Sequence, residues 1–332
     1  MTSRSPRSQR RSGRTVTQSA ARGRGSAAAA KRSRTGDRTT ADVPVGRGRW
    51  ALLVGILVVL TALMVGTVVA LLSLNGEDAP SAGDPVRLEH VHGLGVDPAD
   101  GAVYAGTHYG LIRIGADGEA SRVADRVQDF MGFTVVGAEH YLASGHPGAG
   151  QDGPANLGLI ETTDGGQTWD TVSLEGEADF HALEARHGLV YGYNAGTLMV
   201  SEDGETWETR GSLPLADFAV SPSDPDTLVA TTEQGPARST DGGRSFSPMP
   251  GAPLLQLVSW TDDSLLVGIA PDGATYISDD DGQSWQQRAS VEGQPEALTA
   301  VGRQVYVALA GGTVVRSTDG GASYSTMYEE DG

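Results

Sequence analysis

Five short segments of related sequence decide the fold of this chain of 332 residues. They read TTDGGQTW (162–169), SEDGETW (201–207), STDGGRSF (239–246), SDDDGQSW (278–285) and STDGGASY (317–324). The aromatic residues that close them follow one another at steps of 38 or 39 residues. A period near 40 residues, with strand-like segments in between, is typical of the four-stranded blades of a β-propeller. We call these five segments the repeat turns.

Each repeat turn contains the residue types that a tight strand-to-strand connection needs. An Asp can accept backbone N–H groups of its own turn, a glycine allows positive φ, and an aromatic residue begins the next strand. We therefore expect a structural role for Asp164, Gly166, Trp169, Gly204, Trp207, Asp241, Gly243, Phe246, Asp280, Gly282, Trp285, Asp319, Gly321 and Tyr324. The second repeat turn is one residue shorter, and alignment on Gly204 and Trp207 puts Glu202 where the others have Asp.

The segments between the repeat turns alternate as strands do. Residues 86–125 follow the same plan without a repeat turn, with HVHGLGVD (90–97), AVYAGTHYG (102–110) and LIRIG (111–115) as successive strands. The sequence thus predicts an all-β propeller of six four-stranded blades over residues 86–328, with seven blades as the alternative. The segment Val86–Glu89 could close the ring as a strand of the last blade.

The chain before residue 86 divides into three further zones. Residues 1–49 hold 13 of the 24 basic residues and two acids, and we expect a disordered cytoplasmic tail. Residues 50–74 carry no charge over 25 positions, which is long enough for a transmembrane helix. A single-pass signal anchor in the cell membrane is therefore expected, with the N-terminus inside, a linker at 75–85 and the propeller outside. A cleaved signal peptide is the alternative.

The charge and the cysteine content exclude several classes of site. Residues 75–332 contain 40 acids and 11 arginines, a balance of −29, so we expect the propeller to repel nucleic acid. The chain has no cysteine, which excludes disulfides and thiolate metal sites. We expect the protein to be a monomer that contacts the lipid bilayer through residues 50–74.

The histidines suggest a ligand site. All seven lie between positions 90 and 187. His92 and His181 fall on expected inner strands, His108 and His146 at the ends of second strands, and Asp129 at the start of the inner strand between. Imidazole and carboxylate bind divalent metals, so these five residues are candidate ligands of a metal or a polar molecule. The alternative is that the histidines form hydrogen bonds to backbone groups of the loops. The sequence assigns no catalytic residue and no definite cofactor.

Three expected inner strands begin with the pair Asp-Phe, at Asp129, Asp179 and Asp217. One interpretation is that each Asp starts its strand while the Phe packs between blades. The other is that Asp97, Asp129, Asp179 and Asp217 form a ring of carboxylates at one mouth of the central channel.

The repeat turns resemble the BNR or Asp-box repeats of sialidases, sortilin-type receptors, certain glycosidases and photosystem assembly propellers. The resemblance covers about residues 86–327 and implies the fold, but it says little about activity. The sequence around the histidines also resembles that of exported single-anchor propellers that are often labelled glycosyl hydrolases. Sialidases use three arginines, the first in an Arg-Ile-Pro signature; here the nearest match is Arg113-Ile114-Gly115, which we expect on a third strand.

These features favour a membrane-anchored binding or recognition module over an enzyme. Its ligand would be a glycan, a peptide or a protein on the propeller face near blades 1–3, where a divalent metal is a candidate cofactor. The first alternative is a glycoside hydrolase of the sialidase-like superfamily. The second is an assembly factor for a complex of the cell envelope.

Overall fold

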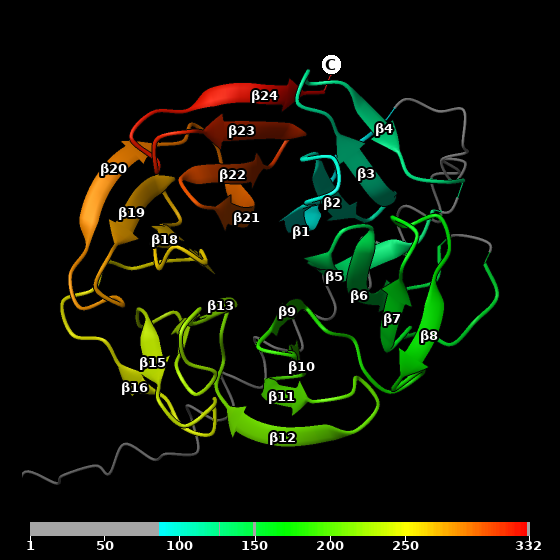
Figure 1. The fold of residues 1–332 in the computed structure, drawn as a ribbon, viewed down its shortest axis with the longest axis horizontal. Coiled ribbons are helices and arrows are strands. Elements are labelled where there is room, and N and C mark those ends of the chain that lie inside the picture. Colours follow the sequence, from blue (N-terminus) through cyan, green and yellow to red (C-terminus); the bar gives the residue numbers. More distant parts are fainter. Residues whose placement is uncertain (1–85, 126, 149–150, 331–332) are drawn as a thin grey trace, which may run out of the picture. The chain divides into compact units, whose positions relative to one another are not determined.

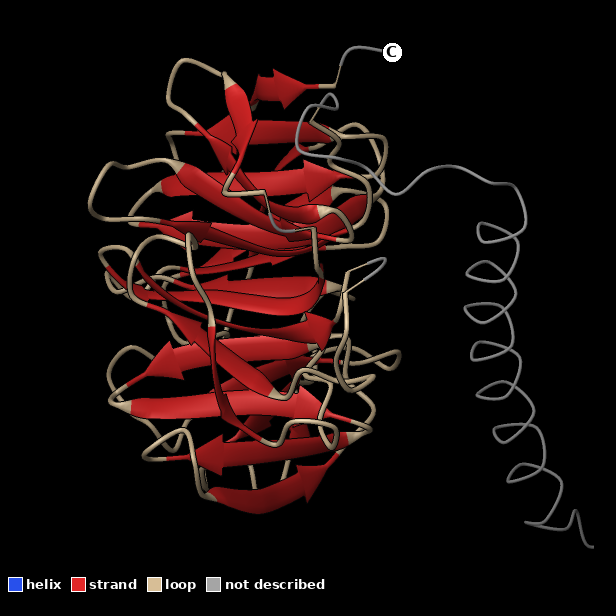
Figure 2. Ribbon diagram, turned by 90° about the vertical axis from the view of Figure 1, so that its right-hand side faces the viewer, coloured by secondary structure: helices blue, strands red, loops and turns tan. Residues whose placement is uncertain are grey.

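The described part of the chain is a six-bladed β-propeller. The computed structural model describes residues 86–330 except 126, 149 and 150. Within this part, 24 strands form six antiparallel sheets of four strands each. The sheets stand around one central axis (Figure 1), and their strands cross between two loop-bearing faces (Figure 2). The expectation of six four-stranded blades is confirmed, and the alternative of seven is wrong.

Blades 1 to 3 come first along the chain. Blade 1 contains β1 (Val91–Val96), β2 (Val103–Thr107), β3 (Gly110–Ile114) and β4 (Ala120–Arg122). Blade 2 contains β5 (Asp129–Gly137), β6 (His140–His146), β7 (Leu159–Thr162) and β8 (Asp170–Ser173). Blade 3 contains β9 (Ala182–Arg186), β10 (Leu189–Asn194), β11 (Thr197–Ser201) and β12 (Trp207–Ser212).

Blades 4 to 6 complete the ring. Blade 4 contains β13 (Asp217–Val220), β14 (Leu228–Thr231), β15 (Ala237–Ser239) and β16 (Ser247–Pro248). Blade 5 contains β17 (Leu257–Trp260), β18 (Leu266–Ile269), β19 (Ala274–Ser278) and β20 (Gln286–Ser290). Blade 6 contains β21 (Pro295–Val301), β22 (Gln304–Leu309), β23 (Thr313–Ser317) and β24 (Ser325–Glu329).

The core lies between neighbouring blades. Every residue of the second strands β2, β14 and β18 is buried, because both faces of these strands are covered. The outer strand β20 reads QQRAS and is mostly exposed. The phenylalanines of the Asp-Phe pairs, Phe130, Phe180 and Phe218, are all buried. This packing agrees with the interpretation that they fill the space between blades.

The repeat turns are held by their own side chains. In the first of them, Asp164 Oδ1 accepts the Thr168 N–H at 2.9 Å, and Asp164 Oδ2 accepts the Thr168 hydroxyl at 2.6 Å. These bonds to Thr168 lower the pKa of Asp164 to about 2. Gly166 has a φ of 90° and donates its N–H to the Thr162 hydroxyl at 2.9 Å. The Asp residues at 241, 280 and 319 make equivalent bonds.

The short second repeat turn requires a correction. Its carboxylate is supplied by Asp203, which accepts the N–H groups of Glu205 at 2.9 Å and Thr206 at 2.7 Å. The alignment that placed Glu202 in this role is wrong, because the missing residue is the first glycine of the turn and not a residue before the Asp. Gly204 takes the place of the second glycine, with a φ of 74°.

One side chain joins each pair of neighbouring blades at the inner or second strand. In every case an oxygen of one blade accepts a backbone N–H of the next. The six acceptor–donor pairs in ring order are Asp97–Glu139, Ser144–Phe180, Glu184–Val220, Asp217–Val258, Ser259–Ala300 and Glu296–Val91. These bonds give several channel-side carboxylates a structural role.

The ring closes without an extra strand. Residues 86–90 form no strand, so the expectation of a closing strand at Val86–Glu89 is wrong. Blade 6 already takes its four strands from consecutive residues and needs no fifth. Instead, Leu88 is buried in the core between blades 1 and 6, and its N–H donates to the Glu330 carboxylate at 3.1 Å.

The expected tail, transmembrane helix and linker, residues 1–49, 50–74 and 75–85, lie outside the described residues. In the portion that is described, no helix is long and apolar enough to cross a membrane.

Candidate functional site

Side chains from three consecutive blades meet at one face of the propeller. His92 is the second residue of β1, His108 lies in the turn after β2, Asp129 begins β5, His146 ends β6, and His181 immediately precedes β9. Inner strands begin and second strands end on the same face, because neighbouring strands of a blade are antiparallel. We call the face on which these five residues lie the histidine face. Topology therefore explains why residues spread over 90 positions lie together.

The first part of the site is the cluster of His92, His108 and Asp129. One potential ligand atom from each residue lies within 4.8 Å of the other two. The His92 and His108 rings are stacked, with centroids 4.8 Å apart and planes at 13°. The distance from His108 Nε2 to Asp129 Oδ1 is 3.7 Å, which is too long for a hydrogen bond.

The second part lies beside it and contains Asp179, which the sequence analysis placed in the possible carboxylate ring but not among the five candidate ligands. Its Oδ2 is 2.9 Å from Nε2 of His181 and 3.5 Å from Nε2 of His146. His146 is itself oriented by the Ala155 carbonyl oxygen, 2.7 Å from Nδ1. The pairs Asp-Phe and Asp-x-His in DFHAL (179–183) were the available signals for Asp179.

Three polar atoms of this site are buried without a hydrogen-bond partner in the described part of the protein. They are Nε2 of His92, Oδ1 of Asp129 and Oδ1 of Asp179. Leaving a buried polar atom unsatisfied costs about 1–3 kcal/mol. Native proteins leave few such atoms unpaired, and three of them at one site indicate that the site takes up a further group.

Burial and neighbouring charges set the protonation of the site. Burial, then the charges of His108 and His181, lowers the pKa of His92 to about 3. Burial also lowers the pKa of His108, although Asp129 opposes the shift. Both imidazoles are therefore neutral at pH 7, the form that binds metals. Burial raises the pKa of the Asp129 carboxyl against the opposing effect of His108.

The neighbouring pair behaves differently. The hydrogen bond that His181 donates to Asp179 raises the pKa of His181. Burial alone would raise the pKa of Asp179, but the hydrogen bond from His181 and nearby histidine charges outweigh it, so the pKa is lowered. Asp179 and His181 therefore form a charge-assisted pair beside the neutral imidazoles.

The site lies at one end of the central channel, a cavity of about 790 Å³ lined by all six inner strands. His92, His181 and Glu296 line this cavity. Toward the other face, Arg186 reaches from β9 to the Trp260 carbonyl at 2.8 Å and to Asp262 at 2.9 Å, two blades away. Glu184 and Asp217 also line the channel, and burial raises the pKa of each to about 7.

The expected carboxylate ring divides into two groups. Asp129 and Asp179 contact histidines of the mouth, whereas Asp217 accepts backbone N–H groups of Phe218 and Val258. Asp97 lies at the opposite end of the inner strand, where it accepts the Tyr141 hydroxyl. Two further residues join the mouth: His90 stacks on His108, and Glu296 Oε1 lies 3.8 Å from Nδ1 of His90.

Comparison with known proteins identifies no family for this chain. No family model matches the sequence, and no curated protein matches it. Among solved structures, the fold is similar to one partner of a nidogen/laminin complex, with a TM-score of 0.54, 11% identity, and coverage of 68% of this chain and 93% of that chain. It is also similar to a gluconolactonase from Xanthomonas campestris, with a TM-score of 0.53, 14% identity, and coverage of 70% and 94%.

A third similar structure is YCF48 bound to D1 peptide, with a TM-score of 0.47, 17% identity, and coverage of 73% of this chain and 83% of that chain. These neighbours include an enzyme as well as proteins in complexes with partners. The TM-scores of the first two structures show a similar fold at identities of 11% and 14%, and a shared fold does not give a function.

Proposed function

We propose that this protein is a membrane-anchored extracytoplasmic binding module whose histidine face holds a divalent transition metal. The observation that carries the proposal is the set of buried, unpaired atoms in the mouth, Nε2 of His92 and Oδ1 of Asp129, with His108 beside them. Two neutral imidazoles and a carboxylate are a ligand set for zinc, copper or iron, and not for calcium or magnesium.

The geometry suits such an ion once the His108 ring leaves its nearly parallel stack on His92, because a metal lies in the plane of each imidazole that binds it. Zinc–ligand bonds of about 2.0–2.2 Å place tetrahedral ligand atoms about 3.4 Å apart. The atoms of His92, His108 and Asp129 lie within 4.8 Å of one another and must close slightly. His108 lies in a turn with its side chain 38% exposed, so it can rotate to do so.

Three protein ligands leave a coordination position open. An external carboxylate, imidazole or hydroxyl of a peptide, protein or glycan could bind there, which would make the metal the recognition element of the module. Asp179 and His181, next to the cluster, would donate or accept hydrogen bonds to the bound group.

Titration calorimetry tests this function. The full-length chain, solubilised in detergent and stripped with a chelator, should bind one zinc ion. The variant His140→Ala should bind zinc equally, because His140 pairs with Glu161 at 2.6 Å on the other face. Absence of stoichiometric zinc binding to the wild-type chain would sink the proposal.

We further infer that the repeat turns are Asp-box repeats and that the propeller belongs to the sialidase/sortilin-like superfamily. The hydrogen bonds of Asp164, Asp241, Asp280 and Asp319 support this assignment. Sialidase activity receives no such support. Arg113 lies on β3, the third strand of its blade, and its guanidinium binds Asp100 at 2.7 Å.

The membrane anchor is the remaining part of the proposal. It rests on the 25 uncharged residues at 50–74, which follow an arginine-rich segment. We expect the intact protein to stay in the membrane pellet after washing with alkaline carbonate. Recovery of a shortened chain in the supernatant would indicate a cleaved signal peptide instead.

A further inference from the structure

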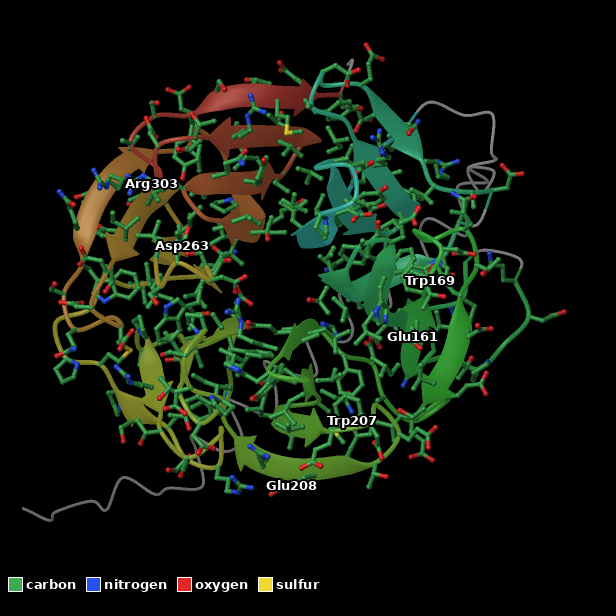
Figure 3. The ribbon with its side chains drawn as sticks, viewed as in Figure 1. Glu161, Trp169, Trp207, Glu208, Asp263 and Arg303 are labelled. Atoms are coloured by element: carbon green, nitrogen blue, oxygen red, sulfur yellow. The ribbon has the colours of Figure 1, made fainter. Side chains whose placement is uncertain are left out.

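A second cavity lies between blades 2 and 3, on the face opposite the histidine face. Its volume is about 380 Å³. The strand 1–2 turn of blade 3, His187–Leu189, forms one wall, and the short repeat turn at Glu202–Gly204 forms another. Blade 2 supplies the third wall through β6, β7 and β8. We call this cavity the blade 2–3 pocket; Figure 3 labels Glu161 and Trp207 on the two blades that form it.

The second repeat turn, which lacks one glycine, borders this pocket. In three other blades the first glycine of the repeat turn donates its N–H to the strand 1–2 turn of the same blade. These bonds are Gly165 to Glu139 at 2.8 Å, Gly242 to Asp226 at 2.9 Å, and Gly320 to Arg303 at 2.9 Å. Blade 3 has no residue at this position, and its repeat turn and strand 1–2 turn are not joined in this way. Blade 5 has Asp281 there and also lacks this bond among the described residues, so the shorter turn of blade 3 is what distinguishes the pocket.

The pocket has an apolar floor. Leu142 and Leu159 form it and are themselves buried. Val172 and Leu189 extend the apolar surface, and Val136 at the edge is 42% exposed. A cavity of this size is at the lower end of the roughly 300–1,000 Å³ of ligand pockets, and it suits one long side chain better than a large molecule.

The rim of the pocket is acidic, and its basic groups are already engaged. Glu161, Glu202 and Asp203 lie at the rim. The one arginine in the lining, Arg186, binds Glu184 at 3.0 Å as well as Asp262 and the Trp260 carbonyl. Nε2 of His187 binds the Ser221 carbonyl at 2.7 Å. His140 also lines the pocket, and its Nε2 lies 2.6 Å from Oε1 of Glu161, so Glu161 is paired through one oxygen. Glu202 is in no ion pair among the described residues and leaves negative charge at the rim above the apolar floor.

We propose that the blade 2–3 pocket binds an arginine side chain presented by a protein partner. The methylene groups of arginine would lie on Leu142 and Leu159, and the guanidinium would bind the carboxylate of Glu202 and Oε2 of Glu161, the oxygen that His140 does not bind. A guanidinium matches carboxylates through paired N–H donors, which an ammonium group cannot do. The histidine face plays no part in this interaction.

Saturation-transfer NMR on the full chain in lipid nanodiscs tests the proposal, because the method detects weak binding. The probe is the end-blocked peptide Gly-Ser-Arg-Ser-Gly, compared with peptides that carry citrulline, lysine or alanine in place of arginine. The arginine methylene protons should receive the strongest saturation, and citrulline and alanine peptides should give none above empty nanodiscs. Equal saturation of the lysine or citrulline peptide would overturn the assignment to arginine.

Two variants locate the binding. Insertion of one glycine between Asp203 and Gly204 restores the length of the other repeat turns and should remove the arginine signal by closing the pocket. Glu161→Gln/Glu202→Gln keeps the volume and should also remove it, even if the insertion prevents folding. The matched control Glu233→Gln, an exposed acid outside this pocket, should leave the signal unchanged. An arginine signal that survives in the double variant would overturn the proposal.

Discussion

Replacing His92 and His108 together by alanine should abolish the rise in melting temperature that zinc gives to the wild-type protein. A metal that binds only the folded chain stabilises it by about 2.7 kcal/mol at 100 times the dissociation constant. For a domain of this size, that free energy raises the Tm by about 5–10 °C. The double variant removes both imidazoles of the cluster and leaves Asp129 alone, so the rise should disappear.

The metal-free double variant should still fold. Nε2 of His92 is buried without a hydrogen-bond partner, so its removal relieves an unsatisfied polar atom while leaving a cavity. Scanning calorimetry of the full chain with and without zinc measures both effects. The control His140→Ala should keep the whole zinc-induced rise. A double variant that kept this rise as well would place the zinc elsewhere.

Asp97→Ala should produce a loss of stability of about 3–4 kcal/mol, because it removes the acceptor of a buried network. Asp97 is 1% exposed, and its carboxylate accepts the Tyr141 hydroxyl at 2.6 Å and the Glu139 N–H at 3.2 Å. Both donors belong to blade 2 and would be left without this acceptor. At about 2–4 °C for each kcal/mol, the Tm should fall by about 10 °C.

A double-mutant cycle with Tyr141→Phe separates the network from the packing. Removal of both partners should cost less than the sum of the single changes, because no orphaned hydroxyl remains. Asp100→Ala is the matched control: this acid pairs with Arg113 near the surface, and its loss should cost about 1 kcal/mol or less. Equal costs for Asp97→Ala and Asp100→Ala would show that the buried network does not join blades 1 and 2.

The fold was largely predictable because each blade is coded by local sequence. The Ser or Thr of every repeat turn ends a third strand, at Thr162, Ser201, Ser239, Ser278 and Ser317. The exceptions were segments whose structure depends on distant partners. Val86–Glu89 has a strand-like pattern, but Leu88 packs into the core between blades 1 and 6 and residues 86–90 form no strand.

The candidate site was predictable in its location but not in its contacts. Antiparallel blades require inner-strand starts and second-strand ends to share a face, which places His92, His108 and Asp129 together. The sequence does not say which carboxylates face the histidines. Asp179 and Asp217 share the Asp-Phe pattern, yet the first contacts His181 and the second accepts the Val258 N–H of the next blade. Asp179 lies three residues before β9, whereas Asp217 is the first residue of β13, and the shared pattern does not distinguish these two positions.

The measurement that tests the central claim most directly is X-ray absorption at the zinc edge of the zinc-loaded full-length chain. A metal held by His92, His108 and Asp129 should show two imidazole ligands and oxygen ligands at about 2.0–2.1 Å. The imidazole scattering should vanish in the His92→Ala/His108→Ala variant. A spectrum of oxygen ligands alone, or imidazole scattering unchanged in the variant, would contradict a metal centre on the histidine face.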